Sequence, residues 1–103
     1  MILVLETNGN LLYLFSSVAQ AESHLEAIDI ENREYEFCDE TGQRFVGAII
    51  VPVSRFSNGG FRLRPEGAPD KSIFDSLVAK ARSLDRKCDG IKTLDDLKKI
   101  SRR

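Results

Sequence analysis

The sequence predicts an α+β domain in which an antiparallel β-sheet of four or five strands packs against two or three helices. Apolar, β-rich segments separated by short polar turns occupy the first two thirds of the chain, and amphipathic helical patterns dominate the last third. The chain has 103 residues, of which 42% are hydrophobic and 30% charged. This size and composition are typical of one soluble domain, which we place at residues 1–103.

The N-terminal segment predicts a β-hairpin. Two apolar runs, residues 2–5 and 11–15, flank the dipeptide Asn8-Gly9. This dipeptide favours the positive φ angles of a type I′ turn. Because both runs are apolar at nearly every position, we expect these strands to be central in the sheet and covered on both faces.

A helix is expected to begin at Val18, because Ser17 and Gln20 have the spacing of a capping box. Apolar residues then recur at helical spacing and form the expected buried face: Val18, Ala21, Leu25 and Ile28. Three acidic residues share a neighbouring face of the same predicted helix: Glu22, Glu26 and Asp29.

From Arg33 the pattern changes to a period of two, which is typical of a half-buried strand. Glu34 and Glu36 would point outward, and Tyr35 and Phe37 inward. Further strands are expected from Arg44 to Val53 and, after a second Asn-Gly dipeptide, over residues 61–64.

The segment from Pro65 to Pro69 should end the sheet, with Pro69 in the first turn of a helix. Apolar residues at helical spacing predict this helix: Ile73, Phe74, Leu77, Val78, Ala81 and Leu84. We expect it to end before Gly90. A last short helix would place three residues inward: Leu94, Leu97 and Ile100.

Charge is divided unevenly along the chain. Residues 1–43 carry nine acidic side chains and one cation, a net charge of −8, whereas residues 44–103 carry fourteen cations and seven acids, a net charge of +7. The sum is the overall charge of −1. A strong local field of this kind steers a charged partner even when the whole molecule is almost neutral.

No pattern in the sequence indicates an enzyme, a cofactor or a metal site. His24 is the only histidine, and it has no nucleophile or ligand cluster beside it. Cys38 and Cys88 are 50 residues apart and form no ligand motif, so we expect reduced thiols in a cytoplasmic protein. No apolar run is long enough to span a membrane, and nothing marks the chain for export.

Several short motifs in the acidic half are similar to those of a bacterial family. They are Leu12-Tyr13-Leu14-Phe15, Ala21-Glu22, Leu25 to Asn32, Glu34-Tyr35-Glu36, Asp39 and Gly42. In this part, about residues 11–44, the chain resembles small immunity proteins encoded beside secreted polymorphic toxins, including those of contact-dependent growth inhibition systems. The resemblance implies a cytoplasmic protein that neutralises a toxin domain by binding it.

The residue chemistry agrees with that implication. Many toxin domains are nucleases with basic sites, and an acidic surface can occupy such a site with fast, salt-sensitive association. We therefore predict that the partner, a cognate C-terminal toxin domain, binds an acidic surface with one aromatic anchor. The predicted surface consists of Glu22, Glu26, Asp29, Glu31, Glu34, Tyr35, Glu36, Asp39 and Glu40.

Two other functions fit parts of the sequence. Arginines interleaved with aromatic residues, followed by a basic C-terminal segment, are typical of a small accessory domain that binds nucleic acid; they are Arg55, Phe56, Phe61, Arg62 and Arg64. The acidic half would repel phosphate, so we do not expect nucleic acid as the partner. A third alternative is a module of a larger assembly that pairs through the apolar strand Ala48 to Val53.

Overall fold

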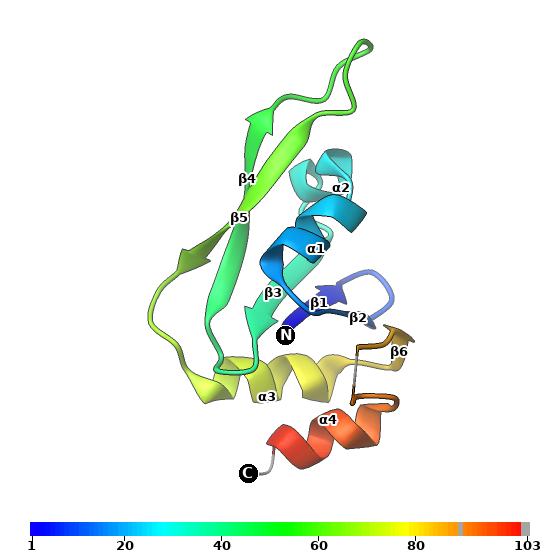
Figure 1. The fold of residues 1–103 in the computed structure, drawn as a ribbon, viewed down its shortest axis with the longest axis vertical. Coiled ribbons are helices and arrows are strands. Elements are labelled where there is room, and N and C mark those ends of the chain that lie inside the picture. The colour runs from blue at the N-terminus through cyan, green and yellow to red at the C-terminus, as the bar shows by residue number, and fades with distance from the viewer. Residues whose placement is uncertain (89, 102–103) are drawn as a thin grey trace.

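The computed structural model describes residues 1–88 and 90–101 and confirms the α+β fold class (Figure 1). One six-stranded sheet has the order β5-β4-β3-β1-β2-β6, and only the β2–β6 pair is parallel among those described. The sheet therefore has one strand more than the largest number predicted. The strands are β1 (Ile2–Glu6), β2 (Leu11–Phe15), β3 (Tyr35–Asp39), β4 (Arg44–Val51), β5 (Gly60–Glu66) and β6 (Ser83–Arg86). The helices in the described residues are α1 (Val18–His24), α2 (Ala27–Glu31), α3 (Lys71–Lys80) and α4 (Leu94–Ser101).

Helices cover both faces of the sheet, and the central strand β1 contributes to a core on each side. Leu3 and Leu5 pack in the cluster that contains Phe74 of α3 and Leu97 of α4. Their neighbours on β1 belong to the opposite cluster, which includes residues of α1 and α2. This alternation explains why β1 is apolar at successive positions, and it confirms the predicted central place of the first hairpin.

The first hairpin has the predicted strands but a different turn. Glu6 pairs with Leu11, which leaves a loop of four residues rather than a two-residue type I′ turn. The positive φ angle lies at Asn10 (55°), not at Asn8 or Gly9. A contact with the start of β3 stabilises the longer loop, because the Thr7 backbone N–H donates to the Glu34 carbonyl at 2.9 Å.

The single helix predicted from Val18 past Asp29 is wrong. α1 ends at His24, Leu25 has extended backbone angles (φ −93°, ψ 155°), and α2 begins at Ala27. The break changes which apolar side chains face the sheet: Ala27 and Ile30 are buried, whereas Ile28 is 44% exposed. A continuous helix would have made the opposite choice, because its period places Ile28 below Leu25.

The helix predicted to reach Leu84 is also too long. Asp70 caps the first turn of α3 by accepting from the Ser72 N–H at 3.0 Å, so Pro69 lies before the helix rather than in its first turn. The backbone becomes extended at Ala81, and β6 then pairs in parallel with β2. With only Leu84 as an apolar residue, β6 shows no strand periodicity in its sequence.

The sequence predicts that the sheet ends at Pro65, and this prediction is wrong. Pro65 lies within β5 and is paired with Phe45 of β4. Because β5 is the edge of the sheet, one of its sides has no neighbouring strand, and a proline there removes no necessary ladder hydrogen bond.

The β4–β5 hairpin projects from the body of the domain and makes the molecule elongated, with extents of 46 × 27 × 23 Å (Figure 1). Its first strand ends at Val51, two residues before the predicted end at Val53. The hairpin joins the rest of the sheet through only two residue pairs, Phe37 with Phe45 and Cys38 with Arg44. Beyond these pairs β3 and β4 separate, and we call the resulting gap the split.

In the part of the chain described, no helix has both the length and the apolar character that crossing a membrane requires.

Candidate protein-binding surface

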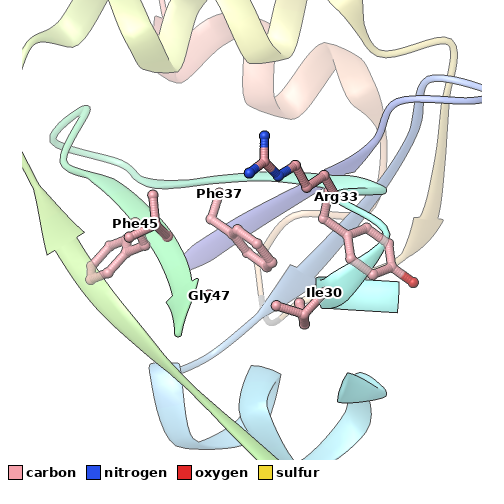
Figure 2. A pocket seen from close by; sticks show the side chains of 7 residues that line it. Ile30, Arg33, Phe37, Phe45 and Gly47 are labelled. Atoms are coloured by element: carbon pink, nitrogen blue, oxygen red, sulfur yellow. The ribbon is translucent and has the colours of Figure 1, made fainter. Parts of the chain in front are cut away.

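The split between β3 and β4 contains a cavity of about 380 Å³. Figure 2 shows Phe37 in the middle of this cavity, with Phe45 on one side of it and Ile30 on the other. The lining is apolar apart from one guanidinium group and one phenol: Ile30, Arg33, Tyr35, Phe37, Phe45, Val46 and Gly47. The cavity is therefore formed by α2, by the segment that follows it and by the two diverging strands.

A close contact between α2 and β4 maintains this arrangement. A Cβ atom added at Gly47 would lie 2.4 Å from Cγ2 of Ile30, which is too close for two carbon atoms. Glycine at this position therefore allows the buried side of α2 to rest on the β4 backbone.

α2 ends in a Schellman motif that brings two carboxylates together. The Arg33 N–H donates to the Ile30 carbonyl at 3.1 Å, and the Glu34 N–H donates to the Asp29 carbonyl at 3.2 Å. Arg33 occupies the left-handed position of the motif, with φ of 55°, where glycine is the usual residue. An arginine with strained backbone angles beside a cavity is a candidate for a functional residue.

Replacing Arg33 with glycine should increase the free energy of unfolding by about 1 kcal/mol, because a non-glycine residue pays about that much for left-handed angles. Urea denaturation measures the difference. Asn10→Gly is the matched control: Asn10 has the same φ of 55°, but asparagine tolerates this region better, so its gain should be smaller. Equal stability of wild type and Arg33→Gly would show that the arginine costs nothing at this position.

Asp29, Glu34 and Tyr35 form an anionic cluster at the split. The pKa of Glu34 is raised, first by a hydrogen bond with Asp29, then by partial burial and by the charges of Asp29 and Glu6. The Tyr35 hydroxyl donates to Oδ2 of Asp29 at 3.5 Å, and burial raises the pKa of Tyr35 to about 12. Among the described residues, neither Asp29 nor Glu34 has a cation within ion-pair distance.

Four of the other predicted acidic residues stabilise the fold locally. Glu22 accepts from the Leu63 N–H at 2.7 Å and so satisfies the open side of β5. Glu31 accepts from the Val53 N–H at 3.5 Å. Asp39 accepts from the N–H groups of Thr41 and Gln43 at 2.9 and 3.0 Å, and Glu40 pairs with the N-terminal amine at 2.9 Å.

The remaining two lie in different surroundings. Glu36 forms an ion pair with Lys80 of α3 at 3.4 Å, on the opposite face of the sheet from α2. Glu26 is exposed at the start of α2, where its side chain makes no capping hydrogen bond. Of the nine residues in the predicted surface, the structure thus gathers Asp29, Glu34 and Tyr35 and distributes the others over several sides.

A second cavity, of about 490 Å³, lies between the α1–α2 connection and the base of the hairpin loop. It contains Glu22 and Glu26 together with Arg62 of β5. The three acidic residues expected on one helix face are therefore separated. Glu22 and Glu26 line this cavity, whereas Asp29 lies beside the cavity in the split.

His24 and Cys38 make their contacts within the fold. Nδ1 of His24 lies 3.0 Å from the Gln20 carbonyl in its own helix, and the ring is 5.7 Å from that of Phe15. Burial raises the pKa of Cys38 to about 12, so its thiol stays protonated at neutral pH. In the described residues no three histidine, cysteine, aspartate or glutamate side chains come close enough to hold a metal ion.

The residues of the nucleic-acid alternative lie together on the β4–β5 hairpin, but one of the two aromatic side chains points into the core. Phe61 is buried, so it offers no surface for stacking on a base, whereas Phe56 is 90% exposed. Arg86 lies over the Phe15 ring at 4.8 Å. The predicted basic tail residues Arg102 and Arg103 lie outside the described residues.

Sequence reasoning missed Arg33 and Gly47 as determinants of this surface. The signal for Arg33 was the end of a helical pattern without a glycine, and no local signal marked Gly47, because its role depends on α2. The surface offers carboxylates, a phenol, a guanidinium group and apolar side chains. Comparisons with family models, with curated proteins and with solved structures found no match to this chain.

Proposed function

We propose that this protein is an immunity protein that binds the toxic domain of a secreted bacterial toxin in the cytoplasm and blocks it. The resemblance of residues 11–44 to such proteins supports the proposal. The observation that carries it is the pair of adjacent carboxylates, Asp29 and Glu34, without a cation among the described residues and beside an open apolar cavity.

Two like charges held together by a helix end are unfavourable in the free protein, and a partner's cation would relieve them. A lysine or arginine that reaches both carboxylates gains charge-assisted hydrogen bonds, while Tyr35 offers an aromatic contact at the same place. A toxin that binds nucleic acid has such cations in its active site, because they hold phosphate. Occupying that site would block the substrate.

The proposal predicts that a gene beside this one encodes a large secreted protein, and the test is to co-express this chain with the C-terminal domain of that protein. We expect a complex that survives size-exclusion chromatography and cells that survive the toxin. A toxin domain that is active and soluble but shows no association with this chain would overturn the proposal.

Removing the two charges should slow complex formation. For Asp29→Asn/Glu34→Gln we expect an association rate constant about 10-fold lower at ~20 mM salt, and a difference that nearly disappears at ~0.5 M salt, since screening removes steering. Stopped-flow fluorescence measures the rate. The control Glu66→Gln/Asp95→Asn removes the same charge at two other exposed sites and should change the rate much less.

Removing the Glu34 charge alone should also alter the pH dependence of stability. The folded-state pKa of Glu34 is raised above its ordinary value of 4.5. The free energy of unfolding therefore falls as the pH rises from 4.5 to this raised pKa, and the loss persists at higher pH. Below pH 4.5 the loss is absent. Glu34→Gln should therefore flatten this decline, and an unchanged pH profile would show that the carboxylates do not interact in solution.

A further inference from the structure

The far end of the β4–β5 hairpin exposes large apolar side chains. Phe56, at the tip, is 90% exposed, and Ile50 and Val51 on β4 are 52% and 46% exposed. The tip is the part of the chain most distant from the helices of the core (Figure 1). A phenylalanine so far from any core contributes almost nothing to folding, which leaves contact with another molecule as a reason for its presence.

The tip is nevertheless ordered by its own hydrogen bonds. Ser54 and Ser57 exchange backbone N–H to carbonyl bonds of 2.9 and 3.3 Å. The Phe56 N–H donates to Oγ of Ser54 at 3.2 Å, and the Gly59 N–H donates to Oγ of Ser57 at 3.0 Å. The aromatic ring is therefore presented on a closed turn, and binding through it would lose little conformational entropy.

The hairpin is cationic as well as apolar. Residues 44–65 contain four arginines and no acidic residue. The guanidinium of Arg55 lies 5.5 Å from the centre of the Phe56 ring. On the face of the hairpin away from α2, Val46 pairs with Arg64 and Ala48 with Arg62, so an apolar row on β4 runs beside a cationic row on β5.

We propose that this hairpin is a second binding element, which inserts Phe56 into an apolar cleft with an acidic rim on the toxin domain. This inference rests on the proposed function. A projecting, preorganised tip fits a concave site, and its arginines require anions around the opening. With the anionic cluster elsewhere on the chain, the partner would meet opposite charges at two places, which fixes one orientation of binding.

A protein cleft fits these features better than a nucleic acid does. Only one aromatic side chain of the hairpin is exposed, because Phe61 is buried. Binding of single strands uses several stacked bases and a continuous basic groove. The exposed row of valine, alanine and isoleucine would stay uncovered on a phosphate backbone, whereas it would be buried in a protein cleft.

The experiment is isothermal titration calorimetry of the toxin domain with the full chain and with Phe56→Ala. We expect an affinity at least about 30-fold weaker for Phe56→Ala, as for an aromatic residue at the centre of an interface. Lys99→Ala is the control, because Lys99 is exposed on α4, away from both the hairpin and α2. Its affinity should stay within about 3-fold of wild type. Arg55→Glu should also weaken binding.

The outcomes separate the two proposals. Wild-type affinity for Phe56→Ala would overturn the insertion and leave the proposed function intact. No binding by the wild-type chain would overturn both. Self-association of the wild type that is lost in Phe56→Ala, measured by analytical ultracentrifugation, would assign the tip to a second copy of this chain and so also overturn the inference. An unchanged melting temperature of Phe56→Ala would exclude unfolding as the cause of weaker binding.

Discussion

Replacing Gly42 with alanine should lower the free energy of unfolding by about 3 kcal/mol. Gly42 has a φ of 83°, which costs an alanine about 1–2 kcal/mol. The added Cβ would also lie 1.9 Å from the Asp70 carbonyl oxygen, and relieving such a clash adds about 1–3 kcal/mol. Guanidinium denaturation, followed by circular dichroism, measures the loss.

The clash cannot be relieved by a side-chain rotation, because the atom that would be struck belongs to the backbone. The Asp70 N–H donates to the Gly42 carbonyl at 3.2 Å, and Asp70 in turn caps α3. Moving this contact would therefore disturb the start of α3. Gly67→Ala separates the two costs, since Gly67 has a φ of 74° but no atom within 4 Å of the added Cβ. Equal losses at the two glycines would contradict the steric part of the argument.

Replacing Gly47 with alanine should cost about 2 kcal/mol and change the shape of the cavity in the split. Gly47 does not have a positive φ, so the cost would come from the 2.4 Å approach to Cγ2 of Ile30. Rotating Ile30 away would remove a buried side chain from the core. Thermal denaturation measures the cost, and a weaker affinity for the toxin domain would follow if the cavity belongs to the interface.

Two comparisons test this explanation. Gly60→Ala is the control within the same hairpin, because its nearest neighbour would be 3.7 Å from the added Cβ, an ordinary contact. In an Ile30→Ala background the cost of Gly47→Ala should largely disappear, which gives a coupling energy of about 1–2 kcal/mol in a double-mutant cycle. Additive effects would place the cause elsewhere than in this contact.

The elements with strong local signals were predictable. The central hairpin follows from two uninterrupted apolar runs, and the start of α1 follows from its cap, where Oγ of Ser17 accepts from the Gln20 N–H at 3.1 Å. β6 was not predictable, because a parallel partner strand at the other end of the chain, rather than its own composition, holds it extended. The break at Leu25 was hidden for a similar reason: burial of Ala27 and Ile30 against β4 and β5 outweighs helical continuity.

The candidate surface was predictable only in part. A run of acids along the chain indicated the region, but it could not indicate which carboxylates would acquire partners. Lys80 reaches Glu36 from 44 residues away, and the N-terminal amine reaches Glu40 from the end of the neighbouring strand β1. Asp29 and Glu34 meet because α2 ends between them in a Schellman motif, which the change of period at Arg33 did not reveal.

The short ladder between β3 and β4 has a mechanical consequence. Strand pairing connects the hairpin to β3 through two residue pairs, Phe37 with Phe45 and Cys38 with Arg44. Other attachments of the hairpin come from helices: Gly47 packs on Ile30 of α2, and the Leu63 N–H donates to Glu22 of α1 at 2.7 Å. Substitutions at the contacts of α1 and α2 with the hairpin should therefore shift Phe56 relative to the carboxylates of Asp29 and Glu34.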